Sequence, residues 1–245
     1  MVKIYIPSYK RPTKCITHKL FCRDYDVCMV IHKKELDAYQ KAMKNFEVSF
    51  LCHTDKETGN MAKVRNFILK NNKEKHFIMC DDDIRTFKYI ENAIQKNMTS
   101  EQINQMITNG FTMAEELGTV LWGINLLQDM LVYRECSPFS LLSVVLGPFS
   151  AHIKNNLEYD ERLLLKEDYD YALQVLQKHH KLLRFNKYSY VTKHITITGG
   201  CAAYRTRDKE IEQMKIFKQK WGKRVVKGDI KKSINPIINV PLKGI

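Results

Sequence analysis

The sequence predicts an α/β fold in which helices flank a mostly parallel central sheet, and three observations support this. Four apolar runs suited to buried strands lie at residues 2–7, 26–32, 47–53 and 76–80. Helix-compatible segments separate these runs, so the expected order is β-α-β-α-β-α-β, which is typical of a parallel sheet covered on both faces. In addition, no run of about 18 apolar residues is present, so no membrane-spanning helix is expected.

The elements of the first third have recognisable boundaries. The first strand ends at Pro7, and residues 33–44 suit a polar-rich helix. Asn60 or Thr58 is suited to cap the next helix because both side chains can accept from its first backbone N–H groups. Apolar residues recur in that helix at a helical spacing: Met61, Val64, Phe67 and Ile68.

The middle and the end of the chain mix helices with short strands. Thr99 and Gln102 form a capping-box pattern, which opens a helix running to Gly118. The remaining expected elements are strands at 119–126, 139–154 and 183–201, an amphipathic helix at 163–181, and a basic helix after residue 205.

The net charge of +13 is concentrated at the two ends of the chain. Residues 1–23 carry six basic and no acidic side chains, and residues 205–232 carry eleven basic and four acidic ones. The rest of the chain therefore sums to zero. Excess charge confined to two segments favours a polyanionic partner such as nucleic acid, although a solvated basic surface would give the same composition.

The cysteines and the N-terminus indicate a cytoplasmic protein, in the host cytoplasm if the chain is phage-encoded. The seven cysteines are irregularly spaced and include no Cys-x-x-Cys pair, so reduced thiols are expected rather than a zinc site. The N-terminal sequence has no apolar core of the kind that a secretory signal needs.

The segment HFIMCDDDI, residues 76–84, carries three consecutive carboxylates at the end of a strand. Ligands of parallel α/β sheets bind beyond the carboxyl ends of the strands. Strand alternation points Asp81 and Asp83 to one side and Asp82 to the other, so Asp82 is expected to be replaceable. Two carboxylates that project together favour Mg²⁺ or Mn²⁺, which completes its shell with phosphate and water. A nucleotide phosphate is therefore implied, and a solvated acidic turn is the alternative.

Four segments in this order resemble the motifs of GT-A fold glycosyltransferases. They read IPSYKRP at 6–12, GNMAKVRNFIL at 59–69, IMCDDDI at 78–84 and LKEDYDYAL at 165–173. The resemblance spans most of residues 2–175 and implies a GT-A, Rossmann-like fold. It further implies a single catalytic domain over 1–245, with a nucleotide-binding half at 1–90, an acceptor half at 91–204 and a basic helical tail at 205–245.

The resemblance implies a donor site for a nucleotide-diphosphate sugar, with a UDP-sugar as the default. Positions matching the family's donor-binding motifs are Pro7, Ser8, Tyr9, Arg11, Arg65, Asn66 and Asp82. An aromatic ring at Tyr9 can stack on a base, and an arginine on an apolar helix face, as at Arg65, needs an anionic partner. Asp81 and Asp83 would ligate Mn²⁺ or Mg²⁺, and His194, from a late strand-like segment, is a third candidate ligand.

The acids at the start of the helix near residue 167 are the candidate catalytic residues. In inverting members of the family that the chain resembles, an acid of this motif deprotonates the acceptor hydroxyl. Asp168 is the first choice because its spacing places it on the inward face of the helix, with Asp170 and Glu167 behind it. A plain N-terminal cap is the structural alternative, and the choice between inversion and retention stays open.

The acceptor follows from a narrower resemblance and from charge. The stretch IYIPSYKR at residues 4–11 resembles phage-type DNA glycosyltransferases that modify a 5-hydroxymethylated base. Basic segments 1–23 and 205–232 would grip DNA phosphates, and Trp221 or Phe217 could contact a base, although both residues at helical spacing also suit plain core packing.

Other functions fit parts of the same pattern. A glycan, lipid or protein acceptor would use the same donor site. Asp81, Asp83, Glu167 and Asp168 could instead hold two metals in a nucleotidyltransferase or nuclease. A non-catalytic nucleic-acid-binding protein would account for the charge, but it would leave the central acids unexplained.

Overall fold

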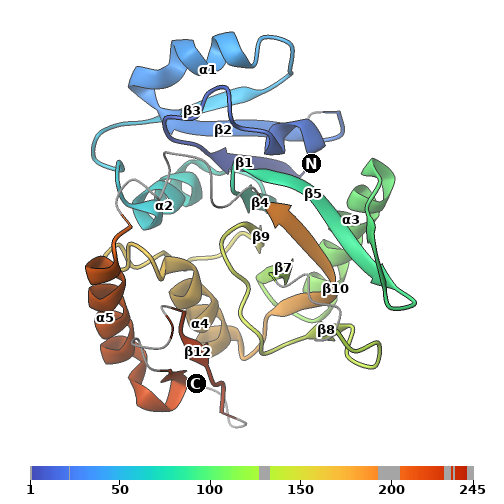
Figure 1. The fold of residues 1–245 in the computed structure, drawn as a ribbon, viewed down its shortest axis with the longest axis vertical. Coiled ribbons are helices and arrows are strands. Elements are labelled where there is room, and N and C mark those ends of the chain that lie inside the picture. Colours follow the sequence, from blue (N-terminus) through green and yellow to red (C-terminus); the bar gives the residue numbers. More distant parts are fainter. Residues whose placement is uncertain are drawn as a thin grey trace.

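The computed structural model describes residues 2–21, 23–126, 133–192, 205–228, 233 and 235–241. A ten-stranded sheet runs through the molecule in the order β3-β2-β1-β4-β9-β7-β10-β5-β6, with β8 paired to β10 (Figure 1). Helices pack on both faces of this sheet, so the predicted α/β class is confirmed. Within the described residues, no helix has the length and apolar character needed to cross a membrane.

The first four strands form a parallel half-sheet, as the alternating pattern predicted. Their bounds are Lys3–Pro7 (β1), Asp26–His32 (β2), Ser49–His53 (β3) and His76–Cys80 (β4). The register pairs Pro7 with Val30 and His32 with His53, so the carboxyl ends of these strands meet at one edge. The connection from β1 to β2 contains a short 3-10 turn instead of an α-helix, η1, Thr17–Leu20.

The second half of the sheet is mixed. The bounds of its strands are Ile84–Glu91 (β5), Ile94–Asn97 (β6), Leu121–Asn125 (β7), Phe139–Ser140 (β8), Phe149–Ile153 (β9) and Leu183–Thr192 (β10). Strand β9 is antiparallel to both β4 and β7, and β10 is parallel to β7 and antiparallel to β5. The β5–β6 hairpin, which the apolar pattern did not predict, begins at Ile84, directly after the turn that follows β4. This turn is too short for the crossover connection that a parallel neighbour of β4 would need.

Three of the α-helices that the structure describes begin at a side-chain cap. Their bounds are Leu36–Ala42 (α1, preceded by the 3-10 turn Lys33–Glu35), Met61–Asn71 (α2), Ser100–Glu116 (α3), Glu167–His179 (α4) and Arg207–Val225 (α5). The Asn60 side chain accepts from the backbone N–H of Lys63, so Asn60 is the cap of α2. Thr99 and Gln102 form the predicted capping box of α3. A small two-stranded ribbon, Val226–Lys227 (β11) and Ile237–Ile238 (β12), follows α5.

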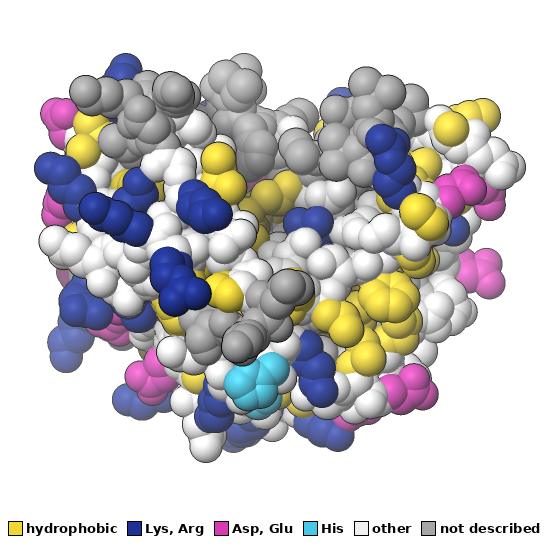
Figure 2. Space-filling model, turned by 90° about the horizontal axis from the view of Figure 1, so that it is seen from below, with side chains coloured by type: hydrophobic (Ala, Val, Ile, Leu, Met, Phe, Trp, Pro, Cys, Tyr) yellow, Lys and Arg dark blue, Asp and Glu magenta, His cyan; other side chains and the backbone are white. Residues whose placement is uncertain are grey.

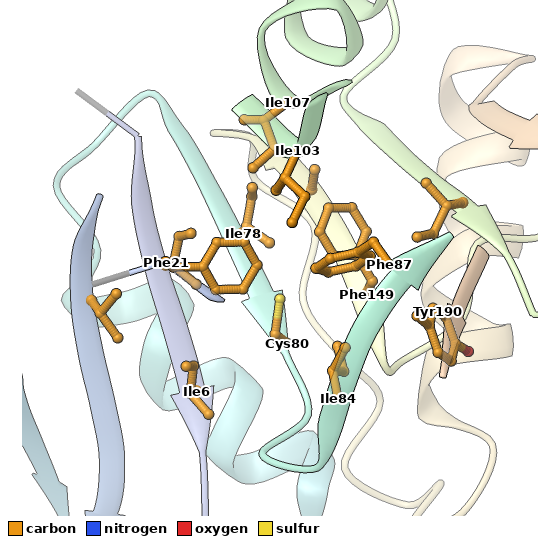
Figure 3. Packing of buried hydrophobic residues seen from close by; sticks show 14 of the residues in the cluster. Ile6, Phe21, Ile78, Cys80, Ile84, Phe87, Ile103, Ile107, Phe149 and Tyr190 are labelled. Atoms are coloured by element: carbon orange, nitrogen blue, oxygen red, sulfur yellow. The ribbon is translucent and has the colours of Figure 1, made fainter. Parts of the chain in front are cut away.

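Two hydrophobic cores cover the two faces of the sheet, and strand alternation divides the side chains between them. Ile4 and Ile6 face the core that includes α1 and α3, whereas Tyr5 faces the core that includes α2, α4 and α5. Figure 3 shows the first core, in which Ile78 and Cys80 of β4 lie near residues of β5 and β9. This packing holds the end of β4 in place.

The basic C-terminal helix is part of the second core. Figure 1 shows α5 beside α4, and Met214 and Phe217 are buried between them and the sheet. Phe217 is fully buried, and the indole Nε1 of Trp221 donates to Asp170 Oδ1 at 2.7 Å. The prediction of a base contact is therefore wrong for Phe217, whereas Trp221 is partly buried and its contact with a base stays a prediction.

Candidate active site at the carboxyl edge of the parallel strands

A cavity of about 510 Å³ opens at the edge where the parallel strands end. Its walls come from the loop after β1, the ends of β2 and β3, the turn after β4, helix α2, the segment before β9 and the start of α4. Arg205 and Asn235, from the C-terminal part of the chain, complete it. Ten of the predicted site residues therefore line one space: Pro7, Ser8, Tyr9, Arg11, Arg65, Asp81, Asp82, Asp83, Glu167 and Asp168.

The turn after β4 is built by backbone contacts on both sides. The backbone N–H of Asp81 donates to Pro148 O at 3.1 Å and so extends the pairing of β4 with β9. The Thr17 hydroxyl donates to Asp81 O at 2.6 Å and accepts from the N–H of Ile84 at 2.9 Å. The segment after β1 thereby holds both ends of the triple-aspartate turn.

Asp82 is held inside the protein, which overturns the expectation that it faces away and is replaceable. Its carboxylate accepts from Arg11 Nη1 at 2.8 Å and from the Ser8 hydroxyl, and only 5% of the residue is exposed. Burial raises the pKa of Asp82, and the contacts with Arg11 and Ser8 oppose this rise. Strand alternation failed here because β4 ends at Cys80 and the three aspartates lie beyond it, with Asp82 and Asp83 in a turn.

Asp81 and Asp83 lie in the cavity wall close to other ionisable groups. Burial raises the pKa of Tyr190 on β10, and the nearby charges of Asp81, Asp168 and Asp83 raise it further. The charges of Asp81, Asp83 and Asp168 therefore all act on the phenol of Tyr190. In the part of the chain that the structure describes, no group of three or more His, Cys, Asp or Glu side chains forms a metal site by itself.

Two carboxylates nevertheless fit a hard divalent cation that takes further ligands from substrate phosphate and water. Asp81 and Asp83 supply that donor set at the cavity wall. The predicted third ligand, His194, lies outside the described residues, so its role stays a prediction. Among the described residues, the prediction of a metal site therefore rests on the carboxylate oxygens of Asp81 and Asp83.

The loop after β1 is fixed by a tyrosine that sequence reasoning missed. Tyr39 of α1 is fully buried, and its hydroxyl lies 2.7 Å from Ser8 Oγ and accepts from the backbone N–H of Arg11 at 3.1 Å. Ser8 and Arg11 therefore serve first to hold the loop against Asp82. Tyr9 is partly exposed in the cavity wall, with Lys10 Nζ 5.0 Å from its ring centroid.

Arg65 and Asn66, adjacent on α2, have different surroundings. Arg65 is buried and lines the cavity, with its Nη1 3.7 Å from Glu167 Oε1 and its guanidinium 5.4 Å from the ring centroid of Tyr159. Burial acts to lower its pKa, but the anionic neighbours outweigh this effect and raise it, so Arg65 stays charged. Asn66 does not line the cavity. Its side chain bonds the backbone N–H and C=O of Tyr159, so its predicted donor-binding role is replaced by a structural one.

The acids at the start of α4 also differ in their surroundings. Asp168 lines the cavity, and its Oδ2 accepts from the backbone N–H of Gly147 at 3.0 Å. A methyl group at Gly147 would overlap the Arg65 guanidinium. Glycine therefore lets the backbone at residue 147 lie close to both Arg65 and Asp168 without displacing the arginine. Asp170 is fully buried outside the cavity wall and accepts from Trp221 and from Lys220 Nζ, 2.7 Å from its Oδ1. The structure therefore removes Asp170 from the candidate bases.

Glu167 has a strongly shifted protonation equilibrium. Burial raises the pKa of its carboxyl to about 8, and the neighbouring charges of Asp168 and Asp81 add to this, whereas Arg65 opposes it. The fold therefore favours the protonated form of Glu167, in which the carboxyl can donate a hydrogen bond. Asp168, which receives the Gly147 N–H, is the better placed of the two to act as a base.

The matching family model decides the class of protein to which this site belongs. A model of the TET-associated glycosyltransferase family matches residues 2–200. The chain belongs to that family. The family match confirms the predicted resemblance to glycosyltransferases. Membership of the narrower phage-type DNA group stays a prediction. No curated protein matched significantly.

Solved structures with the same fold include two of S. aureus TarS. The TarS fragment 1–349 matches with a TM-score of 0.51 and 13% identity, over 77% of this chain and 59% of the fragment. The same fragment in complex with UDP matches with a TM-score of 0.52 and 11% identity, over 90% of this chain and 71% of the fragment. In the first comparison, this TET-associated glycosyltransferase thus spans less than two thirds of the TarS fragment.

Proposed function

We propose that this chain transfers a sugar from a UDP-sugar to the hydroxyl of a 5-hydroxymethylated pyrimidine in DNA, with Mn²⁺ or Mg²⁺ as cofactor. The observation that carries the proposal is the meeting of two acidic pairs in one cavity. Asp81 and Asp83 come from the turn after β4, and Glu167 and Asp168 come from the start of α4. One pair suits a metal-bound leaving group, and the other suits an acceptor hydroxyl.

The donor half of the proposal rests on the strand ends. Tyr9 offers a ring for stacking at the cavity wall, and Asp81 and Asp83 would hold the cation. When bound, the cation supplies neutralisation of the charge that develops on the departing nucleoside diphosphate. A TarS fragment of the same fold is known in complex with UDP, which makes UDP the first nucleotide to test.

The acceptor half rests on the start of α4. Asp168 is the proposed base, which takes the proton of the acceptor hydroxyl as the new glycosidic bond forms. The N–H of Gly147 donates to its Oδ2 and so fixes the orientation of the carboxyl group, and burial raises the pKa of the neighbouring Glu167. Arg65, beside Glu167, carries a permanent positive charge at the same wall.

DNA is the proposed acceptor because of the charge of the C-terminal part. Exposed basic side chains on α5 include Arg207, Lys215, Lys223 and Arg224. Figure 2 shows Lys and Arg side chains gathered on the left of the molecule, the side on which Figure 1 places α5. Basic surfaces of this kind bind DNA phosphates by releasing counterions, so the affinity should fall as salt rises.

The donor is tested by titrating the protein with UDP, GDP, CDP and ATP, with and without Mn²⁺, in a calorimeter. We expect heat of binding with UDP that depends on Mn²⁺. The variant Asp83→Asn should lose the Mn²⁺ dependence, whereas Asp37→Asn, an exposed position on α1, should behave as the parent. Absence of binding to every nucleotide would argue strongly against a nucleotide-sugar donor.

The acceptor is tested by mass spectrometry of DNA after incubation with UDP-sugars and Mn²⁺. Hydroxymethylated duplex DNA should gain the mass of one sugar per modified base, and plain DNA should not change. Release of UDP distinguishes this reaction from nucleotidyl transfer, which releases pyrophosphate, and from nuclease cleavage, which needs no donor. If UDP is released only with a glycan, lipid or protein acceptor, the DNA part of the proposal is wrong and the transferase part stands.

A further inference from the structure

A buried carboxylate on α5 holds two cations at the cavity wall. Glu210 is 2% exposed, and its Oε2 accepts from Lys166 Nζ at 2.6 Å while its Oε1 accepts from Arg205 Nε at 2.6 Å. Lys166 is itself 1% exposed, so this ion pair is almost completely removed from water. One carboxylate balances one of the two cations, and the group of three carries a net positive charge.

Both cations line the cavity, although they come from different parts of the chain. Lys166 immediately precedes Glu167, whereas Arg205 precedes α5 and lies beyond residues 2–200, the segment that the family model matches. Tyr169 lines the same cavity, and burial raises its pKa; the charges of Asp168 and Glu210 add to this rise, whereas Arg205 opposes it. The C-terminal segment thus brings positive charge close to the proposed base.

Helix α5 fixes the geometry of this group. Gln213, one turn after Glu210 and fully buried, accepts from the N–H of Leu164 at 2.6 Å and donates to Arg162 O at 3.2 Å. The segment that precedes Lys166 is therefore held to α5 at two backbone positions. A carboxylate on so rigid a support holds the Arg205 side chain through Nε, while 48% of that side chain stays exposed.

We propose that Arg205, oriented by Glu210 and supported by the charge of Lys166, binds a phosphate group of a substrate in the cavity. A guanidinium is planar and its N–H groups match the oxygens of a phosphate, and the bond from Nε to Glu210 fixes the orientation of that plane. The inference deepens the proposed function and rests on it for the source of the phosphate. That source is either the diphosphate of the donor or a phosphodiester of the DNA acceptor.

The first test uses inorganic pyrophosphate as the probe and needs no sugar transfer. Thermal unfolding of the full chain is measured with increasing pyrophosphate for the parent, Arg205→Ala, Arg205→Lys and Arg85→Ala. Arg85 has the same charge, is exposed on β5 and does not line the cavity. We expect pyrophosphate to raise the Tm of the parent and of Arg85→Ala, to raise it less in Arg205→Lys, and to leave the Tm of Arg205→Ala unchanged.

Two further arms identify the source of the phosphate. Arg205→Ala should weaken either UDP binding in the presence of Mn²⁺ or the binding of hydroxymethylated duplex DNA, by roughly 10-fold for a lost charged hydrogen bond. The arm that changes names the substrate. Arg85→Ala should leave both UDP binding and DNA binding unaltered.

Failure of this inference can be told apart from failure of the proposed function. If pyrophosphate, UDP and DNA all bind Arg205→Ala as they bind the parent, or if the parent binds none of them, Arg205 holds no substrate phosphate and the inference is overturned. If pyrophosphate binding depends on Arg205 but no sugar is transferred, the phosphate site stands and the transferase proposal fails.

Discussion

The acidic turn at residues 81–83 and the acidic start of α4 at 167–170 have similar compositions, yet the structure uses their members differently. In each cluster, one acid is locked into the fold by several partners: Asp82 by Ser8 and Arg11, and Asp170 by Lys220 and Trp221. Asp82 and the remaining acids, Asp81, Asp83, Glu167 and Asp168, all line the shared cavity, whereas Asp170 lies outside its wall.

The two clusters differ in what surrounds their cavity-facing acids. Asp81 and Asp83 follow a strand end and suit a cation. Glu167 is buried beside Arg65, and burial raises the pKa of its carboxyl to about 8. The role of a carboxylate therefore depends on its partners more than on its place in an acidic run. Five predictions test this distinction, in order of decreasing effect.

Asp168→Asn should lower the rate of sugar transfer by roughly 10²–10⁴-fold, the usual contribution of a general base. Asparagine has the same shape and can still accept from the Gly147 N–H, so the Tm should hardly change. UDP release at saturating donor and acceptor measures the rate. A variant that turns over at the parental rate would remove Asp168 from the chemistry.

Asp83→Asn should lower transfer by roughly 10²–10³-fold, because the loss of a metal ligand weakens charge neutralisation on the leaving group by about 3–4 kcal/mol. Raising the Mn²⁺ concentration should recover part of the activity, which it should not do for Asp168→Asn. Steady-state rates across a Mn²⁺ titration make the comparison. Identical Mn²⁺ dependence in parent and variant would show that Asp83 is no ligand.

Asp82→Asn should destabilise the fold by about 3 kcal/mol, because it leaves the Arg11 guanidinium, whose side chain is 11% exposed, without its buried carboxylate. For a chain of this size, that lowers the Tm by roughly 6–12 °C. Calorimetric unfolding measures it, with Asp37→Asn as the exposed control. An unchanged Tm would restore the expectation, drawn from strand alternation, that Asp82 is replaceable.

Asp170→Asn should lower the free energy of unfolding by about 1–2 kcal/mol while leaving the rate constant for transfer near the parental value. Asn can still accept from Trp221 Nε1, but it loses the charge that attracts Lys220. Denaturant unfolding and the transfer assay, run on one preparation, separate the two effects. A loss of rate at parental stability would return Asp170 to the candidate bases.

Glu167→Gln should change the pH dependence of stability. The folded state keeps a proton on Glu167 that the unfolded chain releases between the ordinary pKa of a glutamate, 4.5, and the folded pKa of about 8. The parental free energy of unfolding therefore decreases as pH rises through that window, by at most about 1.4 kcal/mol per pH unit from this group. Urea unfolding at about pH 5 and about pH 8 should show a smaller decrease in the variant; equal decreases would contradict the raised pKa.

The N-terminal half of the fold could be predicted because its signals are local. Apolar runs separated by capped helices, as at Asn60 and Thr99, define parallel strands whose ends must meet at one edge. The β5–β6 hairpin was missed because residues 84–97 have no regular apolar alternation. Strand β5 is held by pairing with β10, about 100 residues away, and β6 pairs with β5.

By itself, the sequence determined which motifs could meet at one site: the loop after β1, Arg65, the acids after β4 and those opening α4. These depend on residue type and on the position of a strand or helix end, which are local properties. Only the tertiary structure decided which acid of each cluster is held by other side chains, that Phe217 is buried, and that Arg205 lies at the cavity wall beside Glu210. Those outcomes depend on burial and on partners distant in the chain, because a buried charge must find an opposite charge wherever the fold brings one within reach.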